Sequence, residues 1–351
     1  MRWLCFLVCF PSLVWAKTSV LFVNPSLQSD PFFMQVEALA RIAATQLDID
    51  LTVIHGDANR LFQKQKIAEY LEKNHPHYIV VQPYSGGGVQ LMEQLADYPV
   101  KIITLERLWQ PDEEPVVGRP GGKYPNWLAE LYFDNTEASR ALTIALQQAC
   151  PDANRLIGIN GAYSQETDRR AEGVYQAMRQ RGGVVEQIVN GKWERPIAAA
   201  QVEQLLRRYP QTQLIWTASD WMALGVIDSL EKFPDQRFCV GGFDWLPQSQ
   251  YALQQGTLTA SAGGHFAMAA WAMVLIYDDV RGKLPKPMPD IPLLQLEILT
   301  AKNLPLYQPL LRAGQWQFVD FKAFSQSSRR TPRANYPFTL QEALRHYQPR
   351  N

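Results

Sequence analysis

The chain has 351 residues, and its 34 Lys and Arg residues balance its 34 Asp and Glu residues. Because neither sign forms long runs, the composition offers no basic surface for phosphate backbones or anionic lipid, which argues against a nucleic-acid partner. The length exceeds what one hydrophobic core usually fills, so we expect two lobes.

Residues 1–16, MRWLCFLVCFPSLVWA, have one Arg near the start, an apolar run and a small Ala at the end. This pattern predicts a cleaved secretory signal peptide and therefore an exported protein. The apolar run is shorter than the roughly 18–20 residues of a membrane-spanning helix, although an N-terminal anchor is the alternative. The mature chain then keeps only Cys150 and Cys239. We expect Cys150 at the end of a helix and Cys239 inside a strand, and these places predict free buried thiols rather than a disulfide.

Short apolar runs then alternate with segments of helical spacing along most of the chain. The first helical segments are 31–46 and 59–73, and the apolar runs lie at 19–23, 50–56, 77–83, 101–106, 129–135, 155–161, 184–191, 213–219, 237–244, 257–264 and 293–300. Continuous apolar runs are typical of parallel strands covered on both faces. The predicted fold class is therefore α/β, a doubly wound parallel sheet present in two copies.

Polar side chains follow several of these predicted strands. Glu106 and Arg107 come directly after the run KIITL, and Asp244 follows FCVGGF. Ligands of open α/β sheets bind beyond the carboxyl ends of the strands. An acid and an Arg beside aromatic rings suit a polyhydroxylated ring, which donates to carboxylate, accepts from guanidinium and stacks its C–H face. The alternative is that the pair only ends a strand at the surface.

Five segments together resemble the type I periplasmic sugar-binding proteins, the ribose- and galactose-binding group. They are DPFF at 30–33, IITLERL at 102–108, DRRAEGV at 168–174, SDWMALGVI at 219–227 and VGGFDWLP at 240–247. The resemblance covers roughly residues 18–300. It implies two Rossmann-like lobes, joined by three hinge segments, that close on a small ligand like a Venus flytrap. The ligand-binding residues that it implies are Phe32, Phe33, Glu106, Arg107, Arg170, Trp193, Ser219, Asp244 and Gly264.

The resemblance also implies the domain organisation. The first lobe is expected at 17–133 and 265–291, the second at 134–264 and 292–304, and a C-terminal extension at 305–351 that packs across the lobes. Ser219 stands where ribose binders have Asn, Gly264 with His265 stands where they have Gln, and Glu106 is one methylene longer than their Asp. These departures point away from ribose itself.

Two further segments are open to more than one interpretation. The long Pro- and Gly-rich segment 108–128 is either a lid or contact surface, or a surface insertion. The amides of SGGGV at 85–89 could hold an anion or form an ordinary first helical turn.

The sequence contains no catalytic motif, so a hydrolase is disfavoured, and it predicts no metal site and no cofactor. We expect a monomeric periplasmic protein that captures a sugar-like ligand and delivers it to an ABC importer. The alternative is a sensor that presents its ligand-bound form to a membrane histidine kinase or cyclase. The two functions share every binding residue.

Overall fold

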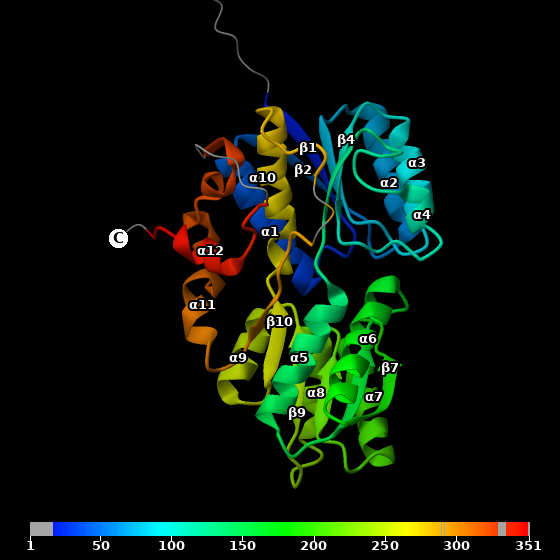
Figure 1. The fold of residues 1–351 in the computed structure, drawn as a ribbon, viewed down its shortest axis with the longest axis vertical. Helices are drawn as coiled ribbons and strands as arrows, with labels where there is room; N and C mark the ends of the chain where they lie inside the picture. The colour runs from blue at the N-terminus through cyan, green and yellow to red at the C-terminus, as the bar shows by residue number, and fades with distance from the viewer. Residues whose placement is uncertain (1–16, 289, 291, 329–334, 350–351) are drawn as a thin grey trace, which may run out of the picture.

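The computed structural model describes residues 17–288, 290, 292–328 and 335–349, which form two lobes stacked along the long axis of the molecule (Figure 1). The predicted signal peptide, 1–16, lies outside the described residues. Over the ranges that are described, no helix is long and apolar enough to cross a membrane.

The first lobe is built on a five-stranded parallel sheet in the order β2-β1-β3-β4-β5. Its strands are β1 (Thr18–Asn24), β2 (Ile49–His55), β3 (Tyr78–Val81), β4 (Lys101–Leu105) and β5 (Trp127–Leu131). Its helices are α1 (Pro31–Gln46), α2 (Arg60–Lys73), α3 (Gly88–Ala96), α4 (Glu114–Val117) and α10 (Met268–Val280), which packs against α1. Helix α1 begins where it does because Asp30 accepts from the amides of Phe32 and Phe33, and Pro31 suits the first helical position.

The second lobe is built on a six-stranded sheet in the order β11-β10-β9-β8-β6-β7. Its strands are β6 (Arg155–Asn160), β7 (Val184–Asn190), β8 (Leu214–Thr217), β9 (Cys239–Phe243), β10 (Ala260–Gly263) and β11 (Glu297–Leu299). Its helices are α5 (Asn135–Ala149), α6 (Gln165–Gln180), α7 (Arg195–Arg208), α8 (Asp220–Leu230) and α9 (Pro247–Gln255). The strand predicted at 293–300 is shorter than expected. It is the last strand of this sheet along the chain, and it lies at the edge of the sheet, antiparallel to β10.

The two α/β lobes with mostly parallel sheets are confirmed. The chain passes between them after β5, after β10 through the short 3-10 helix η1 (His265–Ala267), and again before β11. In both lobes the carboxyl ends of the parallel strands lead into loops, and these loops carry the predicted site residues.

The prediction of free thiols was wrong, because Cys150 and Cys239 form a disulfide with a Cα–Cα distance of 6.4 Å. Cys150 caps the C-terminus of α5, and Cys239 is the first residue of β9. Helix α5 packs on β9 and β10, so the end of the helix lies beside the start of the strand. Which helix covers which strand is a tertiary property that the spacing of the two cysteines does not reveal.

The C-terminal extension runs along one side of both lobes (Figure 1). It contains α11 (Leu304–Leu311), the 3-10 helices η2 (Gln315–Phe318), η3 (Phe321–Phe324) and η4 (Gln326–Ser328), and α12 (Leu340–Arg345). In the second lobe, Tyr307 packs on Trp245 with ring centroids 5.0 Å apart. In the first lobe, Phe338 stacks on Trp271 of α10, also at 5.0 Å. The extension therefore contacts both lobes.

The segment 108–128 is fastened to the first lobe. The Glu113 carboxylate accepts from the amides of Gly86, Gly88 and Gln110 at 3.0, 2.7 and 3.0 Å. An internal carboxylate thus occupies the amides that precede α3, at the place where the sequence suggested an anion. Trp109, near the start of this segment, is buried and donates to Glu130 at 2.6 Å.

Candidate functional site

The loops after β4, β7 and β9 share an uncommon backbone conformation. Glu106, Trp193 and Asp244 have φ angles of 60°, 67° and 110°, in the region that non-glycine residues rarely adopt. Each such residue costs on the order of 1–3 kcal/mol, and such residues cluster at ligand sites. Asp48, Asp57 and Ala58 share this conformation elsewhere in the first lobe, so the burial and charge of these three loops, one in the first lobe and two in the second, are what mark the candidate site.

Glu106 leaves β4 with its carboxyl group buried between the lobes. Its amide donates to the Leu131 carbonyl at 2.7 Å, its side chain is only 3% exposed, and its Oε2 has no hydrogen-bond partner among the described residues. Burial raises the pKa of the Glu106 carboxyl well above its usual range, and the nearby Glu166 carboxylate raises it further, against the opposing effect of Arg170.

Asp244 supplies a second buried carboxyl group from the second lobe. It is 6% exposed, and its Oδ1 lies 3.4 Å from Nε2 of His265. Burial raises the pKa of Asp244 well above its usual range; Arg170 opposes this rise and Asp30 adds to it. The carboxyl groups of Glu106 and Asp244 come from different lobes, and each has its pKa raised by neighbouring acids.

Arg170 lies on α6 and is 2% exposed. Its Nε donates to Oδ1 of Asn135 at 2.8 Å, its Nη1 to the Ala218 carbonyl at 2.6 Å, and its Nη2 pairs with Glu166 at 2.6 Å. Its guanidinium also lies 4.4 Å from the centre of the Phe243 ring. Arg170 is therefore a fixed charge that ties α6 to the start of α5 and to the loop after β8.

His265 lies at the crossing between the lobes and is 1% exposed. Its ring packs between Phe32, at 4.6 Å between centroids, and Phe133, at 5.0 Å. Burial, helped by Arg170, lowers the pKa of His265 to about 3, so the imidazole is neutral near pH 7. Its Nδ1 has no partner among the described residues.

Aromatic rings line the same space. Phe32 meets Phe33 edge to face at 5.1 Å, and the half-buried Trp193 lies 5.8 Å from the Arg170 guanidinium. Trp193 covers Gly161, where an added Cβ would lie 2.1 Å from the indole ring. Only glycine allows this approach, which fixes the position of the Trp193 ring.

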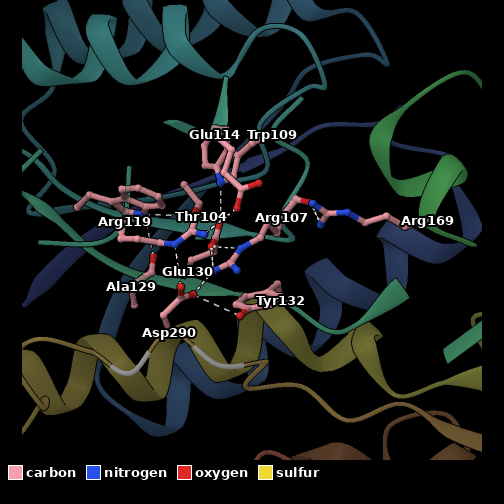
Figure 2. Close-up of polar contacts among 11 residues, drawn as sticks. Thr104, Arg107, Trp109, Glu114, Arg119, Ala129, Glu130, Tyr132, Arg169 and Asp290 are labelled. Carbon is pink, nitrogen blue, oxygen red and sulfur yellow. Dashed lines mark hydrogen bonds and ion pairs between the residues drawn. The ribbon is translucent and has the colours of Figure 1, made fainter. Parts of the chain in front are cut away.

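The structure does not bring Arg107 to this group. Its Nε donates to Oε2 of Glu130 at 2.6 Å, its Nη2 pairs with Asp290, and its guanidinium lies 3.7 Å from the centre of the Tyr132 ring (Figure 2). Arg119, from the segment 108–128, holds the other oxygen of Asp290 at 2.7 Å. Arg107 thus ties the sheet of the first lobe to the third crossing between the lobes.

Ser219 and Gly264 have structural roles in this conformation. The Ser219 hydroxyl caps α8 by accepting from the Met222 amide at 3.2 Å. Gly264 has a φ of 117°, and an added Cβ would lie 3.4 Å from Leu340 of the extension. The residue that follows it, His265, is the one that faces the other site residues.

Sequence reasoning missed Glu166, Phe133 and the position of His265. Glu166 stands four residues before Arg170, a spacing that puts both on one helix face, and this signal could have identified it. Phe133 lies two residues beyond the end of the last strand of the first lobe, one residue further than Glu106 lies beyond β4. Among the described residues, no group of three or more His, Cys, Asp or Glu is arranged to hold a metal ion.

Hydrogen bonds join the lobes across the site. The Gln165 amide donates to Oγ of Ser85, and Nη1 of Arg169 donates to the Arg107 carbonyl, both at 3.3 Å; Figure 2 shows Arg169 reaching across from α6. Together with the burial of Glu106 and Asp244, these contacts describe a conformation in which the lobes are closed on the site.

Comparison with known proteins gives a consistent result. The model of a family described as "Periplasmic binding protein domain" matches residues 20–284. The ribose import binding protein RbsB of Salmonella typhimurium is 22% identical over 248 residues, which cover 70% of this chain and 79% of that protein. The RbsB of Escherichia coli strain K12 is equally similar.

Solved structures extend the similarity to the fold. A periplasmic sugar-binding protein from Pseudomonas fluorescens superposes with a TM-score of 0.82 at 25% identity, over 93% of this chain and 99% of that chain. An ABC transporter solute-binding protein from Actinobacillus succinogenes, solved with bound D-allose, has a TM-score of 0.72 at 17% identity, over 83% of this chain and 100% of that chain.

Proposed function

The chain belongs to the periplasmic binding protein family, and from this premise we propose that it captures a small sugar-like ligand between its lobes and delivers it to an ABC importer. The observation that supports this most is the pair of buried carboxyl groups, Glu106 and Asp244, presented from opposite lobes beside aromatic rings. Only a ligand held between the lobes can meet both groups at once.

The binding residues that we propose follow from their places in the structure. Glu106 and Asp244 accept from the ligand, and the rings of Phe32, Phe33 and Trp193 cover its apolar face. Arg170 positions the loops of the second lobe, since all three of its nitrogens already have protein partners.

We further propose that the protein works as a monomeric, non-enzymatic binding protein in the periplasm, after removal of residues 1–16. The disulfide between Cys150 and Cys239 suits an oxidising compartment. Sensing through a membrane kinase or cyclase would use the same closed form, and it is distinguished from import by the membrane partner.

A thermal-shift screen tests the proposal. The purified protein is heated alone and with pentoses, hexoses, polyols and amino sugars. A true ligand at 100 times its Kd adds about 2.7 kcal/mol of stability. The variant Glu106→Gln should lose most of this gain, whereas Glu72→Gln, on the exposed face of α2, should keep it. A panel in which no compound raises the melting temperature contradicts the proposed function.

A further inference from the structure

The closed site contains more carboxyl groups than cationic side chains. Glu166 pairs with Arg170 at 2.6 Å, and Glu106 and Asp244 are buried near the same guanidinium, which lowers the pKa of both. Asp30 and Asp220 lie close enough to Asp244 to interact with it, since Asp30 raises the pKa of Asp244 and Asp244 raises the pKa of Asp220. One guanidinium therefore faces several carboxyl groups in a space from which water is largely removed.

The two acids from opposite lobes form no direct ion pair with a protein cation among the described residues, although Arg170 lies close enough to lower the pKa of both. Every nitrogen of Arg170 already donates to Asn135, Ala218 or Glu166. Arg107, the other candidate, is held by Glu130 and Asp290. Within the described ranges, no Lys or Arg forms an ion pair with Glu106 or Asp244, and their neighbour His265 is neutral.

Asp220 and Asp30 have hydrogen-bond donors within the protein. Asp220 accepts from Oγ of Ser261 at 2.7 Å and from the Leu246 amide at 3.0 Å. Asp30 caps α1. In contrast, Oε2 of Glu106 is buried and has no partner among the described residues. A buried carboxylate without a partner is costly unless a ligand supplies the partner.

We propose that the ligand carries a protonated amine, as in an amino sugar or an aminocyclitol, and that its ammonium group pairs with the carboxylates of Glu106 and Asp244. The ammonium group supplies a positive charge that pairs with both carboxylates, and an N–H donor for the partnerless Oε2 of Glu106. The ring of such a ligand still presents a C–H face to Phe32 and Trp193, whose π-systems also attract a cation. This inference rests on the proposed function and narrows its ligand class.

Matched ligand sets test the inference by calorimetry on the purified protein. The amines are D-glucosamine, D-galactosamine, D-mannosamine and scyllo-inosamine. Each is compared with its neutral parent, D-glucose, D-galactose, D-mannose or scyllo-inositol, and each amino sugar also with its N-acetyl derivative. The parent lacks the charge, and the acetyl group removes it while keeping the nitrogen. In at least one set, we expect the amine to bind at least about tenfold more tightly than its neutral partners.

Variants separate charge from shape. Glu106→Gln keeps the size of the side chain and removes its charge, so it should erase the preference for the amine. Glu72→Gln, an exposed change on α2, should preserve the preference. Tighter binding of the neutral parents, or an amine preference that survives in Glu106→Gln, overturns the inference while leaving solute binding intact. If neither these sets nor the wider screen contains a ligand, the proposed function fails as well.

Discussion

Breaking the disulfide between Cys150 and Cys239 should destabilise the second lobe. The bond joins residues 89 positions apart. In the chain-entropy account, closing a loop of that length is worth about 4–5 kcal/mol, through its effect on the unfolded chain. A loss of this size lowers the melting temperature by about 6 °C if the whole chain unfolds as one unit, and by about 14 °C if the second lobe unfolds alone.

Scanning calorimetry of Cys150→Ser, Cys239→Ser and the double variant measures this effect. Because either single change breaks the same bond, we expect three similar losses rather than losses that add up. Reducing agent should lower the melting temperature of the wild type to the same level and leave the double variant unchanged. Equal melting temperatures for the wild type and the double variant would refute the reasoning.

Three further predictions concern the site and the extension. Trp193→Ala should weaken ligand binding by about tenfold or more with a smaller loss of ligand-free melting temperature than a fully buried Trp would give, since the ring is half-buried at the edge of the core. Calorimetry showing a large loss of stability but full affinity would make it a core residue. Burial between the lobes raises the pKa of Glu106, so closure of the ligand-free protein takes up a proton. Lowering the pH from 7.5 to 5.5 should therefore increase the ratio of closed to open molecules by up to about tenfold per pH unit. Small-angle scattering should show a smaller radius of gyration at pH 5.5, and the same response in Glu106→Gln would contradict this origin. Phe338→Ala should lower the free energy of unfolding, measured with a chemical denaturant, by about 3–5 kcal/mol, because the Phe338 ring stacks on Trp271. An unchanged denaturation midpoint would mean that the extension does not stabilise the first lobe.

The strand pattern predicted the fold because its signal is local. Continuous apolar runs identified the parallel strands, and the rule for carboxyl ends directed attention to Glu106 and Asp244. The same reasoning failed for Cys150 and Cys239, because it cannot show that α5 covers β9. Pairing at a separation of 89 residues depends on tertiary packing, which no spacing rule describes.

A ligand contact of Arg107 stays a prediction, and the protein partners of its side chain show a second thing that local sequence does not reveal. Adjacent in sequence, Glu106 and Arg107 were expected to meet one ligand, but the side chains take different directions. Glu130 on the neighbouring strand and Asp290, 183 residues away, hold the guanidinium. Local sequence shows that a charge emerges from a strand, whereas the partner that captures it is set by the assembled fold.

A crystal structure of the protein with the ligand found in the thermal-shift screen tests the central claim most directly. We predict that the ligand lies between the closed lobes, with polar atoms within hydrogen-bond distance of both Glu106 and Asp244, and with the Trp193 ring against its face. A ligand that contacts only one lobe contradicts the account. So does one bound elsewhere, for example in the surface hollow beside α11 that Pro305, Arg312 and Tyr347 help to line.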